Sequence, residues 1–222
     1  MKNKKMWILI GLIVIILVVT IVLQTNTHSR NEGDISFSNP SKLEVFYHVS
    51  ISSVLFHSFY ADYIETMHLQ GNENILDFGS GWGTEAEIMA QQLAKGGNIT
   101  CLDISPTWME VCKKRLAPFQ SVDFIVGDVT KLNIQESTYD IVVIHFVLHD
   151  IEDVYRNNII KSLAKLLKTG GKIYIREPLL SERNMSIKSL RELMMVNDFK
   201  EKQLIQTSSF FNGKMLEGIF EK

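Results

Sequence analysis

The sequence predicts a doubly wound α/β fold with a mostly parallel, Rossmann-like sheet. Two observations indicate this fold class. From Asn74 onward, short apolar runs alternate with segments of helix length, which is the pattern of successive βαβ units with right-handed crossovers. The runs are almost continuously apolar, as expected for strands that helices cover on both faces. The composition agrees, because 45% hydrophobic and 22% charged residues suit a packed core and exclude a disordered chain.

The amino-terminal residues predict one transmembrane helix before this domain. Met6 to Leu23 are eighteen residues without charge, and as a helix they would reach roughly 27 Å and just cross a bilayer. Trp7 and the lysines before it would hold that end at the headgroups. We expect a membrane anchor over residues 1–24, a polar linker over 25–42 and a folded domain over 43–222. A cleaved signal peptide stays the alternative, although its apolar stretch is usually shorter.

The charges bear on the partners and on the membrane orientation. Three of the 23 basic residues precede the apolar segment, which leaves 20 basic against 25 acidic residues, so nucleic acid is not expected as a partner. The same three lysines favour an N-terminus inside the cell and a domain outside. Cys101 and Cys112 are too few for a disulfide framework and lack zinc spacing, and as buried thiols they favour a reducing compartment.

The elements of the domain follow in chain order. Leu43 to Leu69 carry apolar and aromatic residues at mixed spacing, which indicates one or two amphipathic helices. Five apolar runs then predict parallel strands: Asn74–Phe78, Asn98–Asp103, Val122–Asp128, Tyr139–Phe146 and Lys172–Glu177.

Capping signals and a turn punctuate these runs. Thr84 with Glu87 predicts a capping box at a helix start, and Ser105 with Pro106 predicts another helix start. Gly170 with Gly171 predicts a helix end. Asn212-Gly213 joins two strand-like runs near the C-terminus and predicts a hairpin. The sheet is therefore expected to end in an antiparallel pair.

A glycine-rich loop follows the first predicted strand. Asp77 lies near the end of that strand, and Gly79, Gly81 and Gly83 lead into the next helix. Glycines let a backbone approach a ligand closely, and a helix start offers unpaired N–H groups. The G-x-G-x-G spacing differs from the G-x-G-x-x-G of dinucleotide sites. A ligand-binding turn is predicted, and an ordinary tight turn is the alternative.

Two further carboxylates end the next two predicted strands. Asp103 ends the second strand, where an open α/β sheet places an acidic residue against ribose hydroxyls. Asp128 closes the third strand after Gly127, again at a carboxyl end where ligands bind. Asp103 could instead belong only to the start of a helix, and Asp128 could be an ordinary loop carboxylate.

From Asn74 to Pro178 these motifs resemble the class I S-adenosylmethionine-dependent methyltransferases. The resemblance implies S-adenosyl-L-methionine as the cofactor and a seven-stranded sheet with an antiparallel final strand. It also implies a role for each motif in binding this cofactor. The methionine part would be held by Asp77 and the glycine loop, which are Asp77, Gly79, Gly81 and Gly83. Asp103 would hold the ribose, and Gly127 with Asp128 would bind the adenine. Bulky Trp82 in the glycine loop departs from the family pattern.

Two histidines, one at the end of the fourth strand and one just after it, are the candidates for catalysis. Methyl transfer aligns the acceptor's lone pair with the methyl carbon and removes a proton when the acceptor is not already nucleophilic. His149 is the candidate base, because histidine titrates near neutral pH, although it could merely cap or pack. His145 ends the fourth strand and is expected both near the reaction and in the cofactor pocket. No metal is expected to take part.

The acceptor and the compartment are predicted only by class. The fourth strand is not followed by the Asn/Asp-Pro-Pro-Tyr/Phe motif of members that methylate adenine or amide nitrogen. We expect a small-molecule acceptor, or a lipid-like one held by the membrane, methylated by direct displacement. Because S-adenosylmethionine is a cytosolic compound, the domain is expected to face the cytoplasm, against the lysine bias. A nicotinamide-dependent reductase and a non-catalytic S-adenosylmethionine-binding module are the alternatives.

Overall fold

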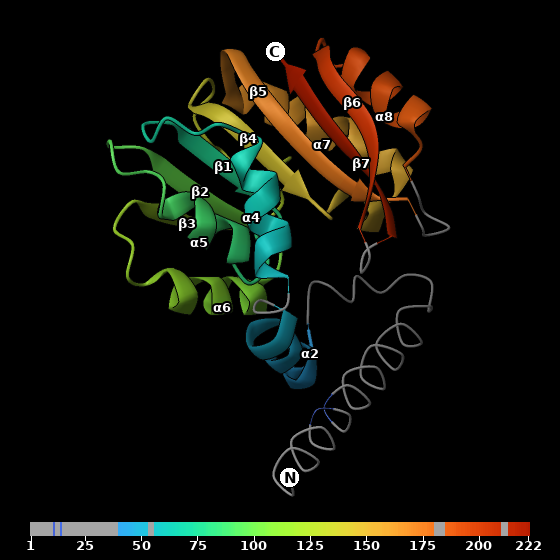
Figure 1. Cartoon of the computed structure of the whole chain (residues 1–222). Coiled ribbons are helices and arrows are strands. Elements are labelled where there is room, and N and C mark those ends of the chain that lie inside the picture. The colour runs from blue at the N-terminus through green and yellow to red at the C-terminus, as the bar shows by residue number, and fades with distance from the viewer. Residues whose placement is uncertain (1–10, 12–13, 15–39, 53–55, 180–184, 210–212) are drawn as a thin grey trace, which may run out of the picture.

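Figure 1 shows the computed structural model, which describes residues 11, 14, 40–52, 56–179, 185–209 and 213–222. These residues form one seven-stranded sheet with the order β3-β2-β1-β4-β5-β7-β6. The strands are β1 (Asn74–Phe78), β2 (Asn98–Asp103), β3 (Val122–Val126), β4 (Tyr139–His145), β5 (Leu167–Pro178), β6 (Lys200–Ser209) and β7 (Gly213–Glu221).

The strand directions confirm the predicted sheet. β1, β2, β3, β4 and β5 pair in parallel, whereas β7 runs antiparallel to both of its neighbours, β5 and β6. The predicted C-terminal pair is therefore present, with Ser209 opposite Gly213, while Asn212 of its predicted turn lies outside the described residues. The chain order reverses between β1 and β4, so a crevice at the carboxyl ends of these strands is the expected ligand position.

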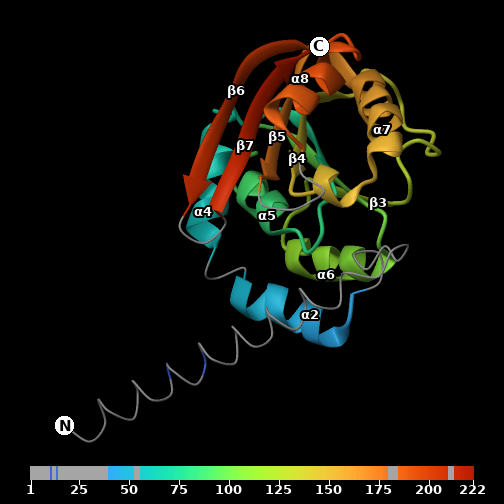
Figure 2. The ribbon, with the colours of Figure 1, turned by 90° about the vertical axis from the view of Figure 1, so that its right-hand side faces the viewer.

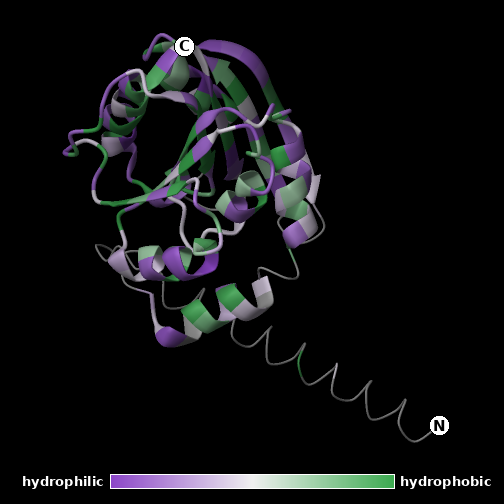
Figure 3. Cartoon of the chain, turned by 90° about the vertical axis from the view of Figure 1, so that its left-hand side faces the viewer, coloured by the Kyte–Doolittle hydropathy of each residue, from purple (hydrophilic) through white to green (hydrophobic). Residues whose placement is uncertain are grey.

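Helices cover both faces of the sheet, as Figures 1 and 2 show. Neighbouring residues of β1 point to opposite faces, because Ile75 packs with the first group of helices and Leu76 with the second. Figure 3 shows hydrophobic residues concentrated along the strands between these layers. The first group is α4 (His57–Glu65), α5 (Thr84–Ala90) and α6 (Pro106–Leu116), and the second is α7 (Asp153–Leu166) and α8 (Ile187–Met195).

Two helix boundaries differ from the prediction. The capping box at Thr84 is wrong: the N-cap of α5 is Gly83, without a side-chain cap, and Glu87 instead pairs with Arg115 of α6 at 2.8 Å. Helix α7 ends at Leu166 and not at the glycine pair, because Leu167 already pairs with Tyr139 in the sheet. The Ser105 cap is confirmed, since its side chain accepts a bond from the Trp108 N–H at 3.2 Å.

The segment before β1 contains short helices, which the sequence also predicted. These are α2 (Lys42–Tyr47), the π-helical turn η2 (His48–Ser52) and α4. No helix among the described residues is long and apolar enough to cross a membrane. Except for Gly11 and Val14, the predicted transmembrane helix and the linker up to residue 39 lie outside the described residues.

Candidate active site

The glycine loop between β1 and α5 has the backbone that its composition predicts. Gly79, Gly81 and Gly83 have φ angles of 77°, 51° and 76°, which side chains rarely allow. A Cβ on Gly79 would collide with a methyl of Val147, and one on Gly83 would lie 2.7 Å from Sγ of Cys112. All three glycines suit the turn, and Gly79 and Gly83 are also required by close packing against the β4 exit and α6.

Asp77, two residues before the first glycine of this loop, carries a buried carboxyl group. The residue is 2% exposed, and its Oδ2 has no hydrogen-bond partner in the described part of the chain. Burial raises the pKa of Asp77 well above its ordinary value, and the nearby charge of Glu85 raises it further. A cationic ligand group, such as an ammonium group held at Oδ2, would offset both the burial of the carboxylate and the repulsion by Glu85.

Asp103 closes the loop from the end of β2. Its Oδ2 accepts a hydrogen bond from the Gly81 N–H at 2.8 Å, and its Oδ1 accepts one from the Ser105 N–H at 2.8 Å. Burial raises the pKa of this carboxyl, although these backbone bonds oppose the rise. Each oxygen keeps a further lone pair, so the carboxylate fits a ligand that offers hydroxyl groups.

Gly127 and Asp128 meet the same edge from the end of β3. The Gly127 N–H donates to the Asp103 carbonyl at 3.0 Å, which ties the two strand ends together. Asp128 accepts bonds from the N–H and hydroxyl of Thr130 and pairs with Lys131 at 3.0 Å. The Thr130 hydroxyl is the main cause that lowers the pKa of Asp128. This carboxylate is ionised and held by its own turn.

His145 ends β4 inside a cluster of aromatic rings. Its Nδ1 contacts Oε1 of Glu85 in the first turn of α5, and its Nε2 is buried without a partner among the described residues. Four side chains, which we call the aromatic enclosure, place their ring centroids 4.2 to 5.8 Å from the imidazole: Phe59, Tyr60, Tyr63 and Phe146. Phe146 has a φ of 56°, uncommon outside glycine, where the chain turns away from β4.

His149 lies one turn further along, in the 3-10 helix η3 (Leu148–Asp150). Its Nδ1 is 2.8 Å from Oε2 of Glu177, and its Nε2 is 3.4 Å from Oδ2 of Asp150. Burial favours the neutral ring, but the hydrogen bond and charge of Glu177, helped by Asp150, prevail and raise the pKa of His149. Both ring nitrogens therefore face carboxylates.

Glu177 organises this exit from the sheet. The residue is fully buried, and it accepts bonds from the N–H groups of Val147, Leu148 and His149 at 2.9, 2.7 and 3.2 Å. Because Glu177 lies near the end of β5 beside β4, its carboxylate fixes the turn that follows His145 and carries His149.

Sequence reasoning missed two charged residues at this site. Glu85 is an ordinary first-turn acid in the sequence, and only its distance from His145 in space reveals it. Arg176 is a charged residue within an apolar strand, and this was the one feature of the sequence that could have marked it as a candidate site residue. Its guanidinium lies 4.5 Å from the Phe59 ring and 4.0 Å from the Tyr63 ring, and it pairs with Glu217 at 2.9 Å.

Trp82, the bulky residue of the glycine loop, packs against the segment before β1. Its ring stacks on His48 of η2 with centroids 4.1 Å apart, and it lies 5.4 Å from the ring of Trp108. The loop is thus joined to the segment that follows the predicted linker. Figure 1 shows α2 near the carboxyl-terminal end of the sheet, on the side of the loop.

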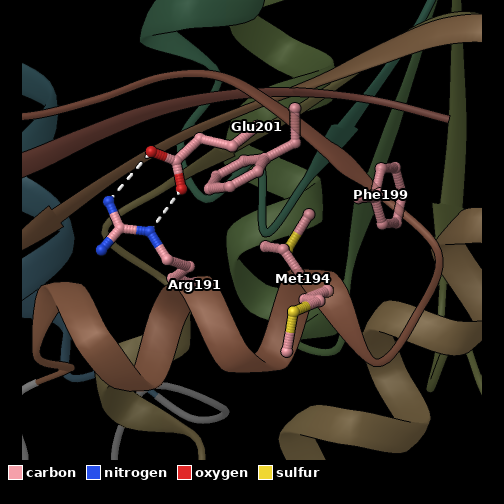
Figure 4. A pocket seen from close by; sticks show the side chains of 6 residues that line it. Arg191, Met194, Phe199 and Glu201 are labelled. Carbon is pink, nitrogen blue, oxygen red and sulfur yellow. Dashed lines mark hydrogen bonds and ion pairs between the residues drawn. The ribbon is translucent and has the colours of Figure 1, made fainter.

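A separate cavity of about 230 Å³ lies between α8 and the β6–β7 edge (Figure 4). The side chains of Arg191 and Glu201 close one side of it with two hydrogen bonds of 2.7 and 2.9 Å. Its strand residues lie at the start of β6 and the end of β7, which is the amino end of the parallel strands. The cavity is therefore remote from the glycine loop.

Comparison with known proteins shows which family the central part of the chain is similar to. Residues 76–175 match the family model described as "Methyltransferase domain". This segment is therefore similar to a methyltransferase domain. It includes the glycine loop, the three strand-end carboxylates and both histidines, and the match favours methyl transfer over the nicotinamide-dependent reductase. A solved S-adenosylmethionine-dependent methyltransferase from Methanosarcina mazei shares the fold at 19% identity, with a TM-score of 0.60 and coverage of 72% of this chain and 96% of that one.

Relatives and solved structures agree with this family. A "Demethylmenaquinone methyltransferase" from Clavibacter sepedonicus is 33% identical over 105 residues, which are 47% of this chain and 41% of that protein. An "Arsenite methyltransferase" from Rattus norvegicus is 32% identical over 138 residues, 57% of this chain and 37% of that one. The chain therefore spans less than half the length of these relatives.

A solved structure shares the fold over most of both chains. It is the 1,6-didemethyltoxoflavin-N1-methyltransferase of Burkholderia thailandensis, with bound 1,6-didemethyltoxoflavin and S-adenosylhomocysteine. The TM-score is 0.65 at 18% identity, covering 85% of this chain and 87% of that one. A protein with a similar fold thus binds S-adenosylhomocysteine, the demethylated form of S-adenosylmethionine.

Proposed function

We propose that the chain transfers a methyl group from S-adenosylmethionine to a small organic acceptor held at the carboxyl ends of β4 and β5. The observation that carries this proposal is a set of buried polar atoms around the glycine loop that lack partners among the described residues, among them Oδ2 of Asp77 and Nε2 of His145. Buried polar groups are normally hydrogen-bonded, so two such atoms beside a positive-φ loop fit a polar ligand.

The residues at the loop suit the cofactor. Asp77 and the glycine loop would hold the methionine part, Asp103 the ribose, and Gly127 with Asp128 the adenine. The bound cofactor supplies an electrophilic methyl group on a sulfonium. The chain itself has to orient the acceptor, exclude water and take a proton, and the aromatic enclosure is suited to the first two tasks.

An organic acceptor is favoured over arsenite. One relative is named for demethylmenaquinone and another for arsenite. Trivalent arsenic is a soft centre that prefers thiolate ligands. The chain has two cysteines, and both are fully buried, with Cys112 packed behind Gly83. Both thiols are enclosed in the hydrophobic core, whereas aromatic rings suit a planar organic compound.

We further propose that residues 1–24 anchor the chain in a membrane, with the domain in the cytoplasm and the acceptor held by the lipid. The uncharged run from Met6 to Leu23 supports the anchor, and the cytosolic cofactor supports the orientation. The test is protease treatment of intact cells and of inverted vesicles. Cleavage of the domain in intact cells would contradict the cytoplasmic orientation.

The test of the function is calorimetric titration of the full chain in mild detergent. S-adenosylmethionine and its demethylated product are expected to bind, and NADH is not. Asp103→Ala should weaken binding at least tenfold, because Gly81 and Ser105 lose their acceptor. Asp62→Ala, on the exposed side of α4, is the matched control. Binding without methylation of any compound in a membrane extract would instead support the non-catalytic module.

A further inference from the structure

We propose that Glu85 is a positioning residue that holds His145 as the base of the reaction, with Nε2 free to take the acceptor's proton. The inference rests on the proposed methyl transfer. It assigns the proton to His145 rather than to His149, and it adds a residue that the sequence did not single out.

The contact between Glu85 and His145 determines which ring nitrogen carries hydrogen. A carboxylate only accepts hydrogen bonds, so Nδ1 of His145 must carry the hydrogen that Oε1 of Glu85 accepts. In the neutral ring the lone pair then lies on Nε2. The side chains are 2% and 12% exposed, so water competes little for this contact. A carboxylate behind an imidazole orients the base in the same way in hydrolytic triads.

The lone pair on Nε2 of His145 has no hydrogen-bond donor among the described residues. The atom is also inaccessible to water. Its surroundings are the rings of the aromatic enclosure, of which Phe146 is nearest at 4.2 Å between centroids. An unsatisfied acceptor among aromatic rings is costly, and a bound hydroxyl would satisfy it.

His149 lacks this arrangement. Glu177 occupies its Nδ1 at 2.8 Å, and Asp150 lies 3.4 Å from its Nε2. A ring between two carboxylates is suited to stay protonated and to hold the β4 exit in place. A protonated ring cannot accept a proton, so the geometry favours His145 for that step.

The pair also limits the chemical class of acceptor. A base is useful only if the acceptor loses a proton on methylation, as a hydroxyl group or an acidic carbon does. In the step, the acceptor's proton moves to Nε2, the acceptor's electron pair forms the bond to the methyl carbon, and the electron pair of the broken S–C bond stays on sulfur. A planar hydroxyl-bearing ring fits both the base and the enclosure.

Nitrogen-15 NMR of the histidine rings in the full chain, in mild detergent, tests the positioning role without turnover. The wild type should show Nδ1 of His145 protonated and Nε2 unprotonated. Glu85→Leu should abolish that preference, and Glu85→Gln should restore it, since the amide oxygen also accepts a bond. Glu65→Gln, at the exposed end of α4, is the matched control. Protonated Nε2 in the wild type, or an unchanged tautomer in Glu85→Leu, would overturn the proposal.

The second arm uses 1,4-dihydroxynaphthalene as the acceptor, under argon. Added with S-adenosylhomocysteine, it should move the Nε2 resonance of His145 and leave that of His149 in place. If the wild type methylates it, kcat should fall at least a hundredfold in His145→Phe and at least tenfold in Glu85→Leu. Losses below twofold, or a probe that shifts only His149, would contradict the assignment. Failure of S-adenosylmethionine to bind would refute the proposed function, and the tautomer would still report on Glu85.

Discussion

Replacing Glu177 with glutamine gives a stability test whose size and pH dependence both follow from the structure. The carboxylate is fully buried and accepts bonds from three backbone N–H groups and from His149. Glutamine keeps the shape of the Glu177 side chain but replaces one carboxylate oxygen with an NH₂ group, which cannot accept the hydrogen bonds that this oxygen receives. Removing one partner of a buried ion pair typically costs about 3–5 kcal/mol, and that is the expected loss at pH 6.

The loss should shrink as the pH rises. The folded-state pKa of His149 is raised above its ordinary value of 6.5, so the stabilisation is complete below about pH 6.5 and disappears as the pH passes through the folded-state pKa. At pH 9 only the unmatched backbone donors of Glu177→Gln should remain, at about 1–3 kcal/mol.

Urea unfolding of the full chain followed by tryptophan fluorescence measures both quantities. Glu136→Gln, at an exposed position before β4, is the control and should change stability by less than about 0.5 kcal/mol. A loss in Glu177→Gln below about 1 kcal/mol at pH 6, or a loss that grows with pH, would refute the reasoning.

Three further predictions concern the packing around the site. Gly83→Ala should lower stability by about 1–3 kcal/mol, because its Cβ would meet Sγ of Cys112 at 2.7 Å, and thermal unfolding would show it. Arg176→Leu should cost about 3–5 kcal/mol in urea unfolding, and Glu217→Leu added to it should restore part of the loss. The hydrogen bond with Cys112 and burial raise the pKa of the Cys101 thiol, so mass spectrometry should find both thiols alkylated by iodoacetamide at pH 8 only after denaturation.

The strands and the glycine loop could be predicted because their signals are local. A run of buried strand residues and a run of glycines each appear within a few positions, and β1 and β2 have the predicted bounds. The conformation of Gly79, Gly81 and Gly83 follows from the same short stretch. These elements carry the residues proposed to bind the cofactor, so their placement could be predicted from the sequence.

The acceptor side was not available, because it is built from residues distant in the chain. Glu85 contacts His145 across 60 positions, and Arg176 donates to the Phe59 carbonyl across 117. The capping box failed for the same reason, since Glu87 found a partner in α6 instead of its own helix end. Local propensity yields to tertiary contacts of this kind.

The stacking of His48 on Trp82 has a consequence for how the protein meets its acceptor. The chain enters α2 on the side of the glycine loop, so a tether to the predicted membrane span would be attached to the domain on that side. The fifteen residues of the predicted linker from Thr25 to Asn39 would reach at most about 50 Å if fully extended. Encounter would then be confined to the membrane surface, and turnover would follow the amount of acceptor per lipid area, not its concentration in bulk.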